Sequence, residues 1–121
     1  MATILVADDD ETLPPLLESI LSGAGHDLSI ARDGRKAYEL IRRVDFDLII
    51  LDHDMPEKTG VEVLSQLRLE KIALPPVIML TARGESDIVQ TCLAAGAKDY
   101  IVKPFKVDEV ARRVQKFLGA G

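Results

Sequence analysis

Four short polar clusters each follow a run of apolar residues. They are Asp8-Asp9-Asp10, Asp52-His53-Asp54, Thr81-Ala82 and Lys103-Pro104. Carboxylate oxygens suit a hard cation such as Mg²⁺, which usually keeps waters and phosphate oxygens in its remaining positions. Lys103 adds a positive charge and Thr81 adds a hydroxyl donor. Together these residue types describe a site for a phosphoryl group.

The carboxylates of two clusters would repel one another if they met without a counter-ion. Two carboxylates about 4 Å apart cost on the order of 4 kcal/mol at an effective dielectric near 20, so we expect a cation between them. Asp52 stands at the end of the strand expected in the middle, which makes it the candidate acceptor. Carboxylates accept phosphoryl groups as acyl phosphates. An ionised nucleophile needs no general base, so positioning and charge neutralisation suffice.

The elements that must position these residues alternate along the chain. Short apolar runs predict five strands, at Ile4–Ala7, Leu28–Ala31, Leu48–Leu51, Val77–Leu80 and Tyr100–Val102. Helical spacing of apolar residues lies between the runs and after the last, most clearly over Leu13–Ala24 and Val107–Leu118. Thr12 is predicted to cap the first of these helices, which places Pro14-Pro15 in its first turn.

This alternation predicts an α/β domain with a doubly wound, five-stranded parallel sheet. The polar Ser29 interrupts the second run, whereas interior parallel strands are uniformly apolar, so the second strand is expected at an edge. We therefore predict a flavodoxin-like (βα)5 fold with strand order 2-1-3-4-5. In such sheets the ligand crevice lies beyond the carboxyl ends of the strands, and all four polar clusters follow those ends.

Length and composition indicate one domain over residues 1–121, whose last residues, 119–121, are a frayed end or a linker stub. The 15 basic and 20 acidic residues give a net charge of −5, which argues against a direct nucleic-acid partner. Cys92 is the only cysteine, so no intrachain disulfide is expected. No leader peptide or membrane-spanning run is evident, which favours a cytoplasmic protein with no membrane partner.

Over nearly its whole length the chain resembles the receiver domain of two-component response regulators. Asp8-Asp9 is similar to the acidic pair of that family, and Asp52-His53-Asp54-Met55-Pro56 followed by Gly60 is similar to its phosphoacceptor loop. Thr81-Ala82, Tyr100 and Lys103-Pro104 complete the set in order and spacing. Each motif alone is weak, whereas all five together are highly specific.

The resemblance implies a phosphorylation-activated signalling switch. Asp52 would take a phosphoryl group from a phosphohistidine on a sensor histidine kinase or a phosphotransfer protein. Asp9 and Asp52 would bind Mg²⁺ directly, the backbone carbonyl of Asp54 would be a third ligand, and Asp8 would act through water. The protein would catalyse only its own phosphorylation and dephosphorylation, and it would signal to a downstream protein or a linked output domain.

The resemblance also assigns the moving parts of the switch. Lys103 would pair with Asp52 or its phosphate, and the Lys103–Pro104 peptide bond would be cis. Thr81 would turn toward the phosphate and Tyr100 would move inward behind it. Asp54 departs from the family pattern, because many relatives carry a neutral residue there. We hypothesise that its charge alters the phosphoryl lifetime.

Three alternatives stay open at this point. Asp52-His53-Asp54 satisfies the Asp-x-Asp pattern of haloacid dehalogenase-like, Mg²⁺-dependent phosphatases, in which Asp52 would be the nucleophile, but Met55 replaces the usual Thr or Val. A flavodoxin-like cofactor module is disfavoured because G-x-G-x-x-G is missing and aromatic residues make up only 4%. A constitutive binding module is disfavoured because the acidic set, Thr81 and Lys103 are intact.

Overall fold

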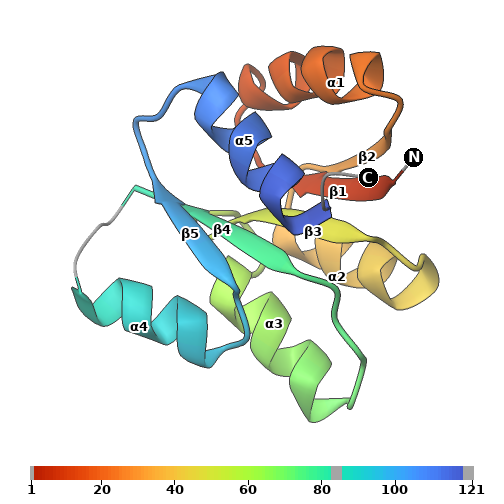
Figure 1. Cartoon of the computed structure of the whole chain (residues 1–121). Coiled ribbons are helices and arrows are strands. Elements are labelled where there is room, and N and C mark those ends of the chain that lie inside the picture. The colour runs from red at the N-terminus through yellow and green to blue at the C-terminus, as the bar shows by residue number, and fades with distance from the viewer. Residues whose placement is uncertain (1, 83–85, 119–121) are drawn as a thin grey trace.

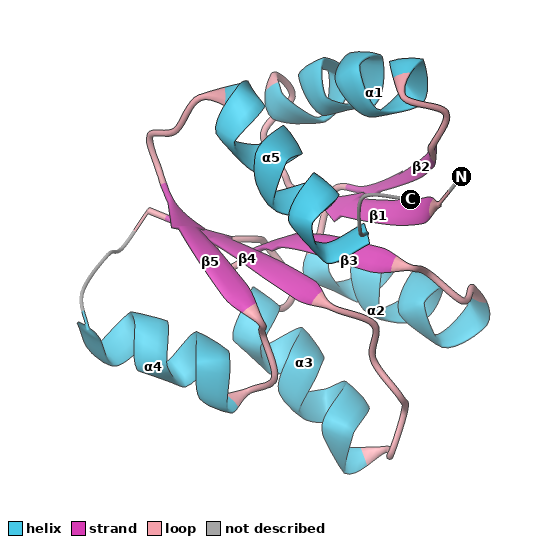
Figure 2. Ribbon diagram, in the orientation of Figure 1, coloured by secondary structure: helices cyan, strands magenta, loops and turns pink. Residues whose placement is uncertain are grey.

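Strand and helix alternate five times in the computed structural model, which describes residues 2–82 and 86–118 (Figure 1, Figure 2). The strands are β1 Thr3–Ala7, β2 Asp27–Ala31, β3 Leu48–Asp52, β4 Val77–Thr81 and β5 Asp99–Val102. The helices are α1 Leu13–Gly23, α2 Gly34–Arg43, α3 Gly60–Leu69, α4 Ser86–Ala94 and α5 Val107–Leu118. Residues 119–121, which the sequence predicts to be a frayed end or a linker stub, lie outside the described residues.

All neighbouring strands pair in parallel, in the order β2-β1-β3-β4-β5. This order confirms the predicted flavodoxin-like topology, with β2 at an edge. The residues of β1, β3 and β4 are almost all buried, whereas β2 is mostly half-exposed. The contrast follows from position, because only interior strands are covered on both faces and flanked on both sides.

The sheet extends slightly further than the apolar runs predict. Pairing continues to Asp52, which lies opposite Leu80, and to Thr81, which lies opposite Val102. Two of the candidate functional residues are therefore the last residues of their strands and not the first of the following loops. The ladder fixes their backbones, which holds their side chains more firmly than a loop would.

Two apolar cores sandwich the sheet. Alternate strand residues point to opposite faces, so Ile49 and Leu51 pack on one side while Leu48 and Ile50 pack on the other. Helices α2, α3 and α4 cover the first face, and α1 and α5 cover the second (Figure 1). None of the helices in residues 2–82 and 86–118 combines the length and the hydropathy needed to cross a bilayer.

The helix starts differ in how they are capped. Thr12 occupies the position before α1 with both prolines in the first turn, as predicted, but its side chain makes no capping hydrogen bond. Asp33 caps α2 by accepting a bond from the Lys36 amide. Thr59 and Glu62 form a reciprocal capping box at α3, in which each side chain accepts a bond from the other residue's amide. Thus α3, which directly follows the Asp52 loop, has a firmly fixed first turn.

Candidate functional site

The carboxyl ends of β1, β3 and β5 bring three carboxylates and a lysine together. Asp8, Asp9 and Asp52 each offer an oxygen within 4.8 Å of the others. Asp8 and Asp52 are buried, while Asp9 is exposed. The predicted meeting of the first and second polar clusters is therefore confirmed in space, and it follows from the parallel pairing of β1 with β3.

Asp8 is fully buried and only half satisfied. One oxygen, Oδ1, accepts a 2.8 Å bond from the Asp10 amide. Within the described residues, Oδ2 has no hydrogen-bond partner. Burial, reinforced by the neighbouring charge of Asp52, outweighs the Asp10 amide and the Lys103 charge and raises the pKa of Asp8 from 3.8 to about 7. An orphaned anionic oxygen in this position fits a site that is completed by a cation.

Lys103 supplies the positive charge within the described structure. Its Nζ lies 2.9 Å from Asp52 Oδ2 and 3.9 Å from Asp8 Oδ2. Burial lowers the pKa of Lys103, but its hydrogen bond to Asp52 and the surrounding carboxylates outweigh burial and raise it above its ordinary value. The lysine therefore stays charged. The Lys103–Pro104 peptide bond is cis, as the resemblance implied.

Asp54 links the third and fourth strands. Its amide donates a 3.1 Å bond to Asp52 Oδ1, and its side-chain Oδ2 accepts a 3.4 Å bond from the Ala82 amide. The sequence placed this extra charge near the site but gave no hint of its partner. The Asp54 carboxylate therefore binds the backbone amide of Ala82, the residue that directly follows Thr81.

Thr81 and Tyr100 lie on neighbouring strands but in different surroundings. Thr81 is fully buried at the end of β4. Tyr100 lies in β5, the outer strand, and is 36% exposed. The register places Thr81 opposite Val102, so the two candidate switch residues are two positions apart across one strand pair.

Gly60 explains how α3 approaches the site so closely. A Cβ atom there would lie 2.8 Å from Met79 Sδ and 2.9 Å from the Asp52 carbonyl oxygen. Only glycine permits this packing of a helix start against the end of β3. His53 lies beside Asp52, but its Nδ1 accepts a 3.4 Å bond from the Val61 amide, which ties the ring to the start of α3.

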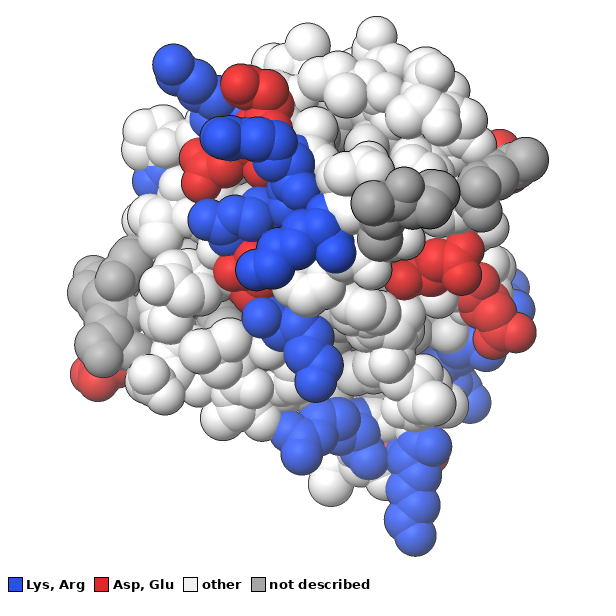
Figure 3. All heavy atoms as spheres, in the orientation of Figure 1, with Lys and Arg blue, Asp and Glu red and all other residues white. Residues whose placement is uncertain are grey.

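Charge is unevenly spread over the surface. Basic side chains gather in a band across the face that carries α5 (Figure 3), where Arg112 and Lys116 are exposed. Arg113 is tied down by a 2.7 Å ion pair with Asp99. The net charge of −5 therefore conceals a basic face, and the absence of a nucleic-acid partner stays a prediction.

Comparisons with known proteins agree with this geometry. Residues 4–115 match the response regulator receiver domain family. The chain is 41% identical over 115 residues to the alkaline phosphatase synthesis transcriptional regulatory protein PhoP of Bacillus subtilis, covering 95% of this chain and 48% of PhoP. It is 39% identical over 112 residues to the DNA-binding response regulator MtrA of Mycobacterium tuberculosis, covering 93% of this chain and 48% of MtrA.

A solved structure, the receiver domain of the Francisella response regulator 1452, superposes with a TM-score of 0.89 at 34% identity, covering 97% of this chain and 96% of that one. The chain spans about half the length of PhoP and MtrA. These matches favour the receiver interpretation over the phosphatase-like alternative. The chain therefore belongs to the response regulator receiver domain family, the phosphorylation-activated switches of two-component signalling.

Proposed function

We propose that Asp52 is the phosphoryl acceptor of this receiver. The observation that carries this proposal is the convergence on Asp52 of two carboxylates within 4.8 Å and the Lys103 ammonium at 2.9 Å. Asp52 also accepts the Asp54 amide, so donors already surround the oxygens that would carry the phosphoryl group. A buried carboxylate held in this way is positioned as a nucleophile and not merely as a turn residue.

Mg²⁺ is the proposed cofactor. Asp9 and Asp52 would hold it directly, Asp8 would act through water, and the Asp54 carbonyl would complete the protein ligands. The donor set consists of oxygens alone, which suits a hard cation, and the buried Asp8 Oδ2 has no hydrogen-bond partner within the described residues, with the Lys103 ammonium 3.9 Å away. When bound, Mg²⁺ neutralises negative charge on the transferring phosphoryl oxygens.

The chain's own residues would carry the transfer. An Asp52 carboxylate oxygen forms a bond to phosphorus as the P–N bond of a phosphohistidine breaks, and the electron pair of that bond returns to the imidazole nitrogen. Lys103 balances charge on the phosphoryl oxygens, and the Asp54 amide donates to the same group. Later attack by water on phosphorus restores the Asp52 carboxylate and releases inorganic phosphate, so no external metabolite is turned over.

The output would pass through Thr81 and Tyr100. Thr81 would turn its hydroxyl toward the phosphoryl group, and Tyr100 would then move inward from its half-exposed position. The downstream partner would be another protein or a linked output domain and not DNA bound directly by these 121 residues. We place the reaction in the cytoplasm, where a kinase with access to ATP would supply the phosphohistidine.

An apolar hollow beside the site would receive the phosphodonor protein. A cavity of about 330 Å³ lies between the start of α1 and the segment that follows Lys103, with Leu13, Leu16 and Phe105 in its lining. Leu16 is 47% exposed and Ile20 on the same helix is 44% exposed. Exposed apolar side chains grouped beside a reactive group are typical of a protein contact.

The decisive experiment is incubation with acetyl phosphate and Mg²⁺, followed by intact-mass and peptide mass spectrometry. We expect one phosphoryl group on Asp52, and none in the shape-matched Asp52→Asn variant. Phosphorylation that persists at the same level in Asp52→Asn would remove Asp52 from its role. Sustained release of phosphate from small stable phosphoesters would favour a phosphatase instead.

A further inference from the structure

The start of α2 lies directly against the phosphoacceptor loop, by which we mean residues 53–59. The Gly34 amide donates a 3.2 Å bond to the Pro56 carbonyl. A Cβ atom on Gly34 would lie only 2.0 Å from the Lys58 carbonyl oxygen and 2.7 Å from its carbonyl carbon. Both atoms belong to backbone, which cannot swing aside as the end of a flexible side chain would. Only glycine fits at this contact.

The part of the loop that meets Gly34 is a strained turn. The Lys58 amide donates a 2.9 Å bond to the Pro56 carbonyl, and Glu57 between them has a φ of 73°. This combination defines a γ-turn of the uncommon, strained kind. Such a conformation in a residue with a side chain persists only where its surroundings hold it. The Pro56 carbonyl is held by two amides, one from within the turn and one from Gly34.

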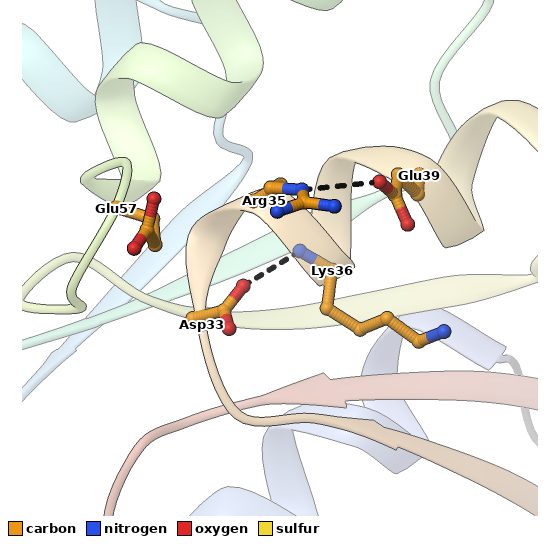
Figure 4. Close-up of a pocket in the computed structure, with 5 residues that line it drawn as sticks. All are labelled: Asp33, Arg35, Lys36, Glu39 and Glu57. Atoms are coloured by element: carbon orange, nitrogen blue, oxygen red, sulfur yellow. Dashed lines mark hydrogen bonds and ion pairs between the residues drawn. The ribbon is translucent and has the colours of Figure 1, made fainter.

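The other side of the contact is rigid. Asp33 accepts a 2.7 Å bond from the Lys36 amide and a 3.1 Å bond from the Ala37 amide, which fixes the first turn of α2. Figure 4 shows Glu57 facing this turn across the pocket that Asp33 also lines. The Lys58 ammonium lies 5.8 Å from the centre of the Tyr38 ring, which adds a further contact to α2.

We infer that Gly34 is a positioning residue for the magnesium site. By holding the turn at Pro56–Lys58, it sets the backbone of Asp54, two residues upstream, whose amide bonds Asp52 and whose carbonyl is the proposed third protein ligand. This inference rests on the proposed function. A Cβ at position 34 would push the loop outward and spoil the ligand geometry, although no atom of Gly34 touches the metal or the phosphoryl group.

The test compares Gly34→Ala with Gly23→Ala. Gly23 ends α1, and an added Cβ there meets nothing within 4 Å, so it is a matched control. Calorimetric titration with Mg²⁺ should give a dissociation constant about 10- to 100-fold higher in folded Gly34→Ala and an unchanged one in Gly23→Ala. The Mg²⁺ concentration for half-maximal phosphorylation by acetyl phosphate should rise by the same factor. A merely structural role would lower stability and leave both values unchanged in the folded molecules.

A second measurement uses the unaltered protein and does not depend on the variant folding. In a Mg²⁺ titration followed by amide NMR, the Gly34 and Lys58 signals should shift with the same half-saturation as Asp54, while the Gly25 amide on the α1–β2 connection stays in place. A shift of the Asp54 amide signal with no shift of the Gly34 signal would overturn the inference. Failure of the unaltered protein to bind Mg²⁺ at all would instead overturn the proposed function.

Discussion

At the scale of single residues, the charge state of Asp8 should depend on pH near neutrality. Its carboxyl group is fully buried, one oxygen lacks a hydrogen-bond partner within the described residues, and its pKa is about 7. Between pH 3.8 and about pH 7 the folded state therefore holds a proton that the unfolded chain has already released. A group whose pKa is raised on folding stabilises the fold at low pH and loses that contribution as pH rises through the folded value.

Without divalent metal, the free energy of unfolding should fall by about 2 kcal/mol between pH 5.5 and pH 8 because of Asp8. Urea denaturation in the presence of a chelator measures this difference. Asp8→Asn, which cannot ionise, should flatten the profile. Mg²⁺ competes with the proton for the same carboxylates, so it should stabilise the protein more at pH 8 than at pH 5.5. Equal stabilisation at both pH values would contradict this account of Asp8.

Asp54 should slow the arrival of an anionic phosphoryl group. A like charge about 6 Å away costs on the order of 1 kcal/mol near a wet surface, so Asp54→Asn should speed phosphorylation by acetyl phosphate about fivefold. Intact-mass spectrometry of samples quenched at successive times gives the phosphorylation rate. The control is Glu57→Gln, which removes a charge from the exposed turn of the same loop and should change the rate little. An unchanged rate in Asp54→Asn would show that the Asp54 charge does not slow phosphorylation.

At the scale of elements, two threonines at helix starts contribute differently. Thr59 takes part in a capping box, and its hydrogen bonds hold the pKa of Glu62 below its usual range. Thr12 makes no side-chain capping bond, because its own amide is bound by Asp10 and its backbone is helical. Residue type alone predicted the Thr12 cap, but a capping side chain requires an extended backbone at that position, and the backbone of Thr12 is helical.

Thr59→Ala should therefore lower the free energy of unfolding by about 1 kcal/mol, whereas Thr12→Ala should change it by less than about 0.5 kcal/mol. Urea denaturation of the two variants beside the unaltered protein measures both. Equal losses would mean that the contacts at the start of α1 support the helix in another way.

At the scale of the whole molecule, the strands position the site residues, and the helices pack against the two faces of the sheet. Parallel pairing gathers Asp8, Asp52, Thr81 and Lys103 at one edge, while two cores on opposite faces hold β1, β3 and β4 in the interior. We therefore expect a change at Asp52 to reach Tyr100 through the two adjacent strand pairs β3–β4 and β4–β5.

The exposure of Tyr100 should fall when the site is filled. Beryllofluoride with Mg²⁺ mimics a phosphoryl group on Asp52, and the inward movement of Tyr100 should protect its ring from nitration, scored by peptide mass spectrometry. The unmodified Tyr100 peptide in the same digest serves as the internal reference. Equal nitration of Tyr100 with and without beryllofluoride, at full occupancy of the site, would argue that the output takes another route.

The sequence by itself determined the order of the elements, the edge position of β2 and the identity of the polar residues at the carboxyl ends. These features follow from hydrophobic periodicity and from the interruption at Ser29, which are local patterns that a parallel sheet must satisfy. Tertiary structure alone decided three other features. They are the buried Asp8 Oδ2 without a hydrogen-bond partner among the described residues, the hydrogen bond from the Ala82 amide to Asp54, and the close approach of Gly34 to the Lys58 backbone. Each depends on atoms brought together from distant segments, and no spacing along a chain encodes the distance between them.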